Sequence, residues 1–177
     1  DDDLRGLFEA GDYEAQRASL HCHTTFSDGV LSPGDLIDEA VRQGYETVSI
    51  TDHDTVAPYD VIVRRADLPE PLSLDEYAEH RGVSLVPGAE LSCWWRWHPV
   101  HILAYGLDPL SPSARDLCRM TATASMGDFS VRSWPVQATA VCLLVRSLGG
   151  TPVLAHPRFY WTDIRRMVAE LAELGGL

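Results

Sequence analysis

Two histidines near the beginning of the chain have a spacing that suits metal binding. His21 and His23 flank Cys22 in a run, residues 17–23, that has the residue types of a β-strand. Since alternate side chains of a strand share one face, both imidazoles can face one ion while Cys22 points away. An isolated pair of this kind is more often structural. Here Asp28 follows in Ser27-Asp28-Gly29, where a carboxylate can fold back toward the same place.

Further groups of the same chemical kind are spread over the chain. They are His53, Glu90, His101 and His156. Together with the first three residues they form a histidine-rich set with two carboxylates. Such a set suits zinc, manganese or iron, whereas calcium prefers almost only oxygen ligands. The sequence therefore predicts a metal site built from distant segments.

The elements that must position these residues alternate between strands and helices. Strands are expected at residues 17–23, 47–51, 83–86, 100–105 and 151–155. His101 lies within one of them, and the other histidines of the set and Glu90 each fall at the C-terminal end of one. In α/β barrels, side chains from different strands converge at that rim. The pattern favours an α/β fold with a parallel sheet, open or barrel-shaped, and helices outside.

Capping signals bound the expected helices. Ser32 and Pro33 begin the first one and Gly44 ends it. The second begins with the capping-box spacing Ser73-x-x-Glu76 and stops at Gly82. The remaining helices are expected at residues 114–120, at 136–148 after Pro135, and after a capping Thr162.

Composition restricts the class of protein. The chain has 177 residues, of which 14 are basic and 26 acidic, giving a net charge of −12. That charge argues against a passive nucleic-acid coat protein but allows a nucleotide substrate, because bound cations can supply positive charge locally. The four cysteines, which form no C-x-x-C pair, are typical of a reducing compartment. Without a visible signal peptide or membrane span, we expect a cytoplasmic protein.

The residues of this set lie in five motifs: HCHTTFSDG at residues 21–29, TDHDT at 51–55, PGAELS at 87–92, HPVHIL at 98–103 and LAHP at 154–157. Together these motifs resemble those of the PHP (polymerase and histidinol phosphatase) domain phosphoesterases, and the resemblance covers residues 18–174. It is closest to the subgroup that contains the bacterial 5′-to-3′ exoribonuclease and nucleoside 3′,5′-bisphosphate phosphatase. This subgroup is indicated by the segment Trp97-His98-Pro99-Val100-His101-Ile102 and by Tyr160, which follows the last motif.

This resemblance implies a single PHP-like domain over residues 1–177 with a distorted (β/α)7 barrel. Its core would comprise residues 14–106 and 149–177, with a helical insertion at 107–148. The implied cofactors are two or three divalent ions (Mn, Zn or Fe) in a cluster at the C-terminal rim. The ligands would be His21 and His23 for the first ion, His101 and His156 for the second, Asp28 and His53 for the third, and Glu90 as a bridge between the first and second.

The implied reaction is hydrolysis of a phosphomonoester or phosphodiester of a nucleotide or RNA end by a metal-bound hydroxide. His98 is a candidate proton donor or leaving-group contact, although a loop histidine without a role is an open alternative. Arg158 is a candidate for gripping a second phosphate, and a solvent-facing arginine is the more common outcome. Asp52 and Asp54 are expected to orient imidazoles, with a turn or helix cap as the alternative.

Three tryptophans, Trp94, Trp95 and Trp97, lie in an aromatic loop beside the expected site. They could form a stacking platform for a base. Aromatic residues more often cover the edge of a core, and we favour that interpretation.

Two departures from the family pattern shape the expectations. Residues 106–148 are shorter than the usual insertion, and a Ser-Asp-x-His element that the family carries near its C-terminus is absent from the chain. We therefore expect a C-terminally incomplete barrel, for which three explanations are open: the chain is a fragment, a homo-oligomer or a second chain completes the barrel, or the domain is a reduced form with a weakened site. The alternatives to an active phosphoesterase are a catalytically impaired PHP-like binding or scaffold module and a histidinol-phosphate phosphatase.

Overall fold

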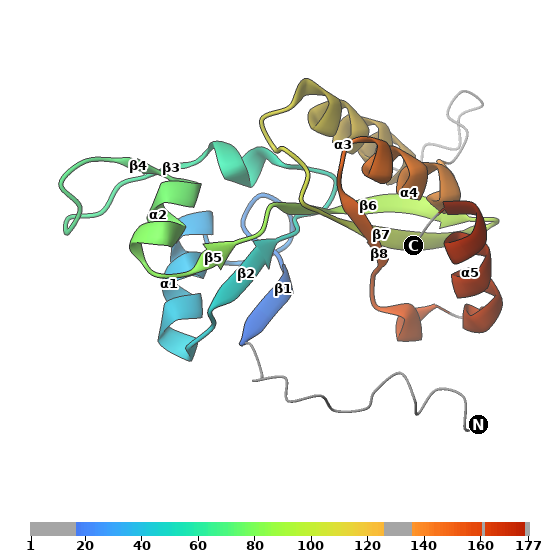
Figure 1. The fold of residues 1–177 in the computed structure, drawn as a ribbon, viewed down its shortest axis with the longest axis horizontal. Helices are drawn as coiled ribbons and strands as arrows, with labels where there is room; N and C mark the ends of the chain where they lie inside the picture. Colours follow the sequence, from blue (N-terminus) through green and yellow to red (C-terminus); the bar gives the residue numbers. More distant parts are fainter. Residues whose placement is uncertain (1–16, 126–135, 161, 176–177) are drawn as a thin grey trace.

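The computed structural model describes residues 17–125, 136–160 and 162–175, and Figure 1 shows two halves that meet at a strand junction. The first half contains β1 (Ala18–Cys22), α1 (Pro33–Gln43), β2 (Thr47–Ile50), a 3-10 turn (Ala57–Asp60), β3 (Ile62–Val63), β4 (Leu72–Ser73), α2 (Leu74–His80) and β5 (Ser84–Leu85). The second contains β6 (Gly88–Trp95), β7 (His98–Tyr105), α3 (Pro112–Ser125), α4 (Ala138–Ser147), β8 (Thr151–Leu154), a 3-10 turn (Pro157–Phe159), α5 (Ile164–Glu170) and a π-helical turn (Leu171–Gly175).

In the first half, β1, β2 and β5 form a parallel sheet in the order β1-β2-β5. Helices α1 and α2 pack beside it through apolar residues such as Ile37, Ile50 and Leu74. The predicted caps of α1 are confirmed: Ser32 accepts a hydrogen bond from the backbone of Asp35, and Gly44 ends the helix at φ 76°. The predicted capping box at the start of α2 is also confirmed.

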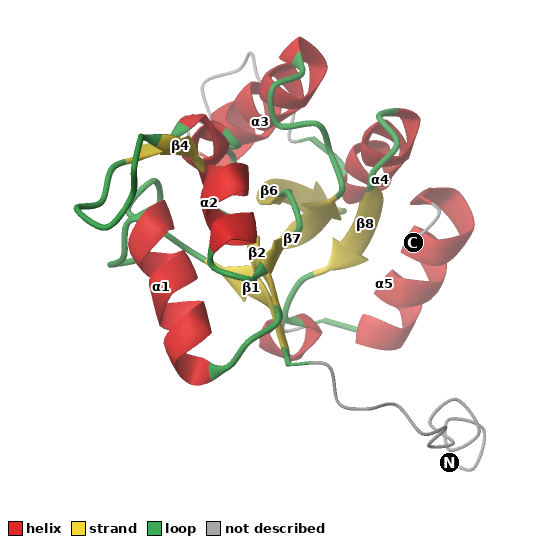
Figure 2. Cartoon of the chain, turned by 60° about the vertical axis from the view of Figure 1, so that its left-hand side comes forward, coloured by secondary structure: helices red, strands yellow, loops and turns green. Residues whose placement is uncertain are grey.

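In the second half, β6, β7 and β8 form an antiparallel sheet. One face of this sheet carries a core of alternating side chains, including Leu91, Val100 and Ile102, against which α3 and α4 pack. Residues 107–148, expected as an insertion, thus supply helices to the same core (Figure 2). Helix α5 and the turn after it pack beside α4, so the opposite face of the sheet is left for the polar side chains described below.

The expectation of a wholly parallel sheet was wrong for this half. Only Arg96 and Trp97 separate β6 from β7, and a parallel crossover needs a dozen or more residues. The aromatic segment expected as a loop is instead the end of β6. Glu90 consequently lies inside a strand and not at its C-terminal end.

The last helix also departs from the prediction at its start. Its cap is Asp163, whose side chain accepts a hydrogen bond from the backbone of Arg166, and not Thr162. Pro135, expected to open the preceding helix, lies outside the described residues. The described helix begins at Ala138, and the side chain of its N-cap residue, Gln137, makes no capping hydrogen bond.

The two halves are joined where the chain beyond β2 runs parallel to β6. The backbone N–H of Glu90 donates to the carbonyl of Asp52 at 3.1 Å, and the N–H of Asp54 donates to the carbonyl of Glu90 at 2.9 Å. Gly88 permits this approach, because a Cβ there would lie 2.6 Å from Ser49 Oγ. Glu90 therefore stands on the seam between the halves.

Within the described residues, the strands form three separate sheets and no closed barrel. The α/β class is confirmed, while the (β/α)7 barrel and its incompleteness stay predictions. None of the described helices is long and apolar enough to cross a membrane. The four cysteines are free thiols; burial raises the pKa of Cys118 to about 12 and that of Cys142 to about 11, so these two are packing residues.

Candidate metal centre

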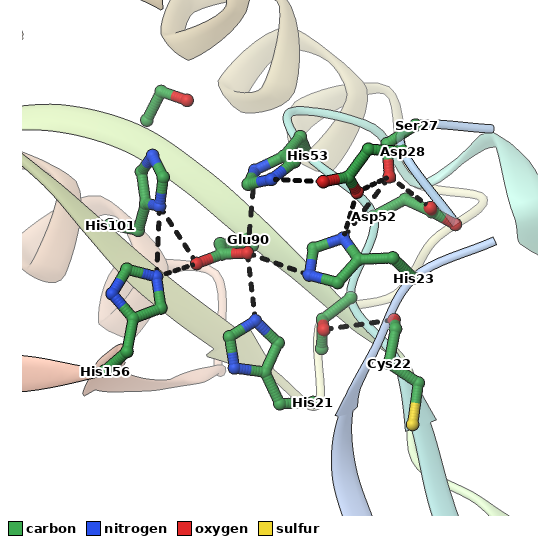
Figure 3. Close-up of polar contacts among 12 residues, drawn as sticks. His21, Cys22, His23, Ser27, Asp28, Asp52, His53, Glu90, His101 and His156 are labelled. Carbon is green, nitrogen blue, oxygen red and sulfur yellow. Dashed lines mark hydrogen bonds and ion pairs between the residues drawn. The ribbon is translucent and has the colours of Figure 1, made fainter. Parts of the chain in front are cut away.

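The carboxylate of Glu90 lies at the centre of a cluster of imidazoles, and its side chain is only 1% exposed (Figure 3). Its Oε1 atom lies 3.0 Å from Nδ1 of His101 and 2.9 Å from Nε2 of His156. These two histidines come from the second half of the molecule, one within β7 and one directly after β8. Their rings also meet each other, with 3.3 Å between His101 Nδ1 and His156 Nε2.

The other oxygen of Glu90 faces the first half of the molecule. Its Oε2 atom lies 2.9 Å from Nε2 of His21, 3.1 Å from Nε2 of His23 and 3.5 Å from Nδ1 of His53. A single buried carboxylate thus contacts imidazoles from both sides of the seam. A buried anion is expensive unless it is paired, so this residue requires cationic partners.

Strand β1 positions the first two histidines by its alternation. His21 and His23 both project toward Glu90, whereas the thiol of Cys22 points away from the cluster (Figure 3). The sulfur of Cys22 lies 3.1 Å from the hydroxyl of Ser19. The placement is the one that the H-x-H spacing favours in a strand.

Asp28 reaches the cluster from the turn that follows β1. Its Oδ1 lies 3.2 Å from Nδ1 of His23, and its Oδ2 lies 3.8 Å from Nε2 of His53. The turn is tight, because the N–H of Gly29 donates to the carbonyl of Thr24 at 3.0 Å. A Cβ at Gly29 would stand 2.1 Å from the carbonyl oxygen of His23, so only glycine fits without a shift of the backbone.

The two aspartates that flank His53 brace the backbone. Asp52, fully buried, accepts hydrogen bonds from the N–H of Thr24 at 2.7 Å and from its hydroxyl at 2.6 Å. It also accepts one from the hydroxyl of Ser27, which lies 3.3 Å from Nδ1 of His23. Asp52 therefore acts on His23 through Ser27, which is consistent with the expected role of orienting an imidazole.

Asp54 performs a similar task on the opposite side of the seam. Its carboxylate accepts from the N–H of Ser92 at 2.8 Å and from the Ser92 hydroxyl at 2.7 Å, which ties the loop after β2 to strand β6. Its backbone is held at φ 52°, a left-handed conformation that aspartate tolerates better than most residues. As with Asp52, the described contacts of Asp54 are to backbone and hydroxyl groups, so any effect of Asp54 on the orientation of an imidazole is indirect and stays a prediction.

His156 occupies a strained position directly after β8. Its backbone adopts φ 26° and ψ 57°, which costs energy for a residue other than glycine and persists only where the surroundings enforce it. Tyr160 is one such neighbour, because its ring lies 5.5 Å from that of His156. Tyr160 is itself anchored, since its hydroxyl accepts a hydrogen bond from the backbone N–H of His101 at 2.8 Å. The buried Nδ1 of His156 has no hydrogen-bond partner among the described residues. The strain and the unpaired nitrogen indicate a functional position.

Electrostatics at the cluster favour an ionised Glu90. Burial alone would raise the pKa of this carboxyl, but hydrogen bonds led by that from His101 hold the pKa well below its usual range. The hydrogen bond to Glu90 raises the pKa of His23 against the opposing effect of burial, whereas burial lowers the pKa of His53. Because a metal binds only the neutral imidazole and the ionised carboxylate, an ion would have to displace the proton that the raised pKa favours on His23.

Three overlapping groups of ligand atoms lie close enough together to share a metal ion, all atoms of a group lying within 4.8 Å of one another. The groups are His21, His23 and Glu90; His23, Asp28 and His53; and His53, Glu90 and His101. The residues fit a divalent cation of the zinc, manganese or iron kind, because imidazole nitrogens dominate and carboxylates link neighbouring groups. His156 is outside these groups but touches Glu90 directly.

The two candidate catalytic residues, Arg158 and His98, lie outside the three groups of ligand atoms. Arg158 is exposed in the 3-10 turn that follows His156, and no ion pair to it occurs among the described residues. His98 lies at the beginning of β7, opposite Trp95, and its exposed ring stacks on that tryptophan at 6.1 Å. Because His98 and His101 are three residues apart, they project from opposite faces of the strand. The structure does not bring His98 to the cluster.

The tryptophans do not form a common platform. Trp95 is buried at the helix-covered face, and its indole donates to Glu170 of α5 at 3.0 Å. Trp97 is 84% exposed in the turn between β6 and β7. The core-edge interpretation therefore holds for Trp95. Sequence reasoning did not identify Thr24 and Ser92, the partners of the two aspartates, although aspartates on both sides of His53 signal that such partners exist.

The chain belongs to the PHP domain family, whose pattern matches residues 19–115, more than half of its length. Curated relatives are similar over a stretch of comparable length. The 5′-3′ exoribonuclease of Haemophilus influenzae is 35% identical over 97 residues, covering 55% of this chain and 31% of that protein. The 5′-3′ exoribonuclease Rnm of Escherichia coli is 39% identical over 96 residues (52% and 28%).

A third relative is the 3′,5′-nucleoside bisphosphate phosphatase of Chromobacterium violaceum, 34% identical over 94 residues, which cover 53% of this chain and 29% of that protein. The matched part of the chain thus spans about a third of the length of these curated relatives.

Solved structures show the same fold over most of the chain. An amidohydrolase from Chromobacterium violaceum with bound sulfate and no metal aligns with a TM-score of 0.69 at 20% identity, covering 90% of this chain and 74% of that one. A metal-dependent phosphoesterase from Bifidobacterium adolescentis aligns with a TM-score of 0.65 at 22% identity, covering 90% and 75%. The PHP fold therefore extends beyond the segment matched in sequence.

Proposed function

We propose that this protein is a metal-dependent phosphoesterase that hydrolyses a phosphomonoester or phosphodiester of a nucleotide or an RNA end. The observation that carries the proposal is the buried Glu90 carboxylate, which contacts imidazoles from both halves of the fold. The names of the relatives support it, since they include an exoribonuclease, a nucleoside bisphosphate phosphatase and a cyclic phosphate diphosphodiesterase.

The metal centre in this proposal contains two or three divalent ions. His21 and His23 would hold the first, His101 and His156 the second, and Asp28 and His53 the third, with Glu90 as the ligand that the first and second would share. Such ions, when bound, acidify a water molecule and neutralise the non-bridging oxygens of a phosphate. They also compensate for a chain whose net charge of −12 would otherwise repel a phosphoester.

The protein's own contribution is to hold these ligands and the substrate in place. Asp52 fixes the turn that carries Asp28 through Thr24 and Ser27, which keeps the His23 ring directed at Glu90. Arg158 projects from the turn beside His156 and is the cation we propose for a second phosphate of the substrate. His98 stays a candidate only if the substrate extends around the edge of β7.

Barrel closure is part of the same proposal. Among the described residues, β1 pairs only with β2 and β8 pairs only with β7, so each presents an unpaired edge. Exposed strand edges tend to recruit another strand. We propose that a further strand, from a homo-oligomer partner or a second chain, covers them. Light scattering of the purified protein tests the oligomeric part of this statement.

A manganese-supplemented activity screen tests the function. The substrates are p-nitrophenyl phosphate, AMP, adenosine 3′,5′-bisphosphate and short RNA, and the expected result is turnover of at least one nucleotide or RNA substrate. His23→Ala should abolish it, because His23 belongs to two of the three ligand groups. His80→Ala, at the exposed end of α2, is the matched control and should retain activity.

The screen also separates the proposal from its alternatives. Retained activity in His23→Ala would mean that the cluster is not the active site. Metal binding without turnover of any substrate would instead favour a PHP-like binding or scaffold module.

A further inference from the structure

Phe159 is a large apolar side chain that stands in water beside the candidate metal centre. It is 77% exposed and ends the 3-10 turn Pro157–Phe159. Its ring meets that of His156 edge to face, with 5.7 Å between centroids and 87° between planes. Because Nε2 of His156 lies 2.9 Å from Glu90, only one imidazole separates Phe159 from the central carboxylate.

The turn that presents Phe159 is fixed at both ends. The N–H of Phe159 donates to the carbonyl of His156 at 3.0 Å. On the far side, the ring of Tyr160 lies 5.5 Å from that of His156, and its hydroxyl accepts from the backbone of His101. The backbone that carries the phenyl ring is therefore fixed before any ligand arrives, which reduces the entropy lost on binding.

Exposure alone is ordinary for a single hydrophobic residue, and Trp97 provides the comparison. Trp97 is 84% exposed, but it lies in the β6–β7 turn and has no ring contact with a cluster imidazole among the described residues. Phe159 combines an equally exposed ring with a direct contact to the centre. Its exposed ring is therefore available to a ligand that binds at the centre.

We infer that Phe159 is the stacking surface for the base of a nucleotide substrate, an inference that rests on the proposed phosphoesterase function. Every nucleobase offers a planar face, so stacking of this kind tolerates different bases and discriminates against substrates that have none. The adjacent Arg158 leaves the ring unobstructed and adds positive charge for a phosphate. Phe159 thus selects nucleoside phosphoesters over base-free sugar phosphates.

Paired substrates test this assignment. Phe159→Leu keeps an apolar side chain but removes the aromatic face, and it should lower kcat/KM for AMP about tenfold, mainly through KM, as expected for the loss of one base–aromatic stack. Activity on ribose 5-phosphate, which has no base, should stay unchanged. Phe159→Trp should restore AMP turnover, and Trp97→Leu should match the unaltered protein on both substrates.

An equal loss on AMP and ribose 5-phosphate would overturn the inference, because it would show that Phe159 only supports His156. No change on either substrate would overturn it as well.

A binding measurement decides the question separately from catalysis. On titration of AMP with the zinc-loaded protein, whose diamagnetic ions do not broaden the signals, the base protons H2 and H8 should shift upfield through the ring current of Phe159, and Phe159→Leu should remove that shift. If no variant hydrolyses either substrate, the proposed function fails and the titration alone judges the stacking. Base-proton shifts of equal size in both proteins would then contradict it.

Discussion

The two halves of the molecule hold their metal-ligand candidates in different ways. In the parallel half, three of the four candidates (His23, Asp28 and His53) lie beyond the ends of β1 and β2, and His21 lies inside β1. In the antiparallel half, two of the three, Glu90 and His101, lie inside β6 and β7, where the ladder pairs Glu90 with Leu103 and His101 with Ser92, and His156 follows β8. A ladder fixes its side chains through backbone hydrogen bonds.

The turns of the parallel half need additional braces. Asp52 and Gly29 supply them, one through buried hydrogen bonds and one through the absence of a side chain. Substitutions near the site should therefore disturb the ligand positions of the two halves to different extents. Those at Glu90 should affect both halves, and those at the braces should affect mainly the parallel half.

Glu90→Gln should have the largest effect, because this carboxylate is the ligand that both halves share. We expect the loss of at least one bound ion and a fall in phosphoesterase activity of at least about a hundredfold, since each catalytic cation contributes several kcal/mol to the transition state. Metal analysis and steady-state kinetics measure both. Glu79→Gln, on the exposed side of α2, is the matched control.

Asp52→Asn and Asp54→Asn test the asymmetry itself. Asp52 braces a turn, so its amide variant should weaken metal binding about 10- to 100-fold, as substitutions of residues that orient ligands typically do. Asp54 braces Ser92, which the β6–β7 ladder already fixes, and its variant should have a smaller effect. Isothermal titration with manganese compares them, and equal losses would show that the two halves do not differ.

Gly29→Ala should displace the turn that carries Asp28. The added methyl group would meet the carbonyl of His23, and we expect a loss of about 1–3 kcal/mol in the free energy of unfolding together with weaker metal binding. Gly82→Ala provides the contrast. Its Cβ meets open space at φ 74°, so it should cost about 1 kcal/mol by backbone strain and leave metal binding intact. Urea unfolding gives both energies.

The smallest effect is expected far from the seam. Ser73→Ala removes the capping box of α2 and should lower the free energy of unfolding by about 1 kcal/mol. Metal content should not change. A loss of bound metal in this variant would mean that the ligand positions depend on the stability of the whole first half and not on local braces.

Sequence reasoning was most successful where the determinants are local. The beginning of α1 depends on Ser32 and Pro33 and its end on Gly44, all within one turn of the helix terminus, so these could be predicted without tertiary information. The H-x-H spacing is likewise a local signal, because the alternation of a strand alone places both imidazoles on one face. The N-cap of α5 was predicted one residue too early, because Thr162 and Asp163 are adjacent and both residue types cap helices, with Asp the stronger of the two.

The antiparallel half was harder to predict because its determinants are not local. The turn Arg96-Trp97 contains neither glycine nor asparagine, the usual signals of a two-residue hairpin, although Arg96 adopts φ 57°. Its unusual conformation is supported by Gln137 and Glu170, which are distant in sequence. The failure to recognise β6 placed Glu90 at a strand end. The same failure concealed the pairing that turns His98 away from the cluster.

The proposed phosphoesterase activity requires a multinuclear metal centre at the seam between the two halves. Elemental analysis of the purified protein after loading with manganese and gel filtration is its most direct test. We predict two or three ions per chain for the unaltered protein and fewer for Glu90→Gln. Fewer than two ions in the unaltered protein, or an equal number in both, would contradict it.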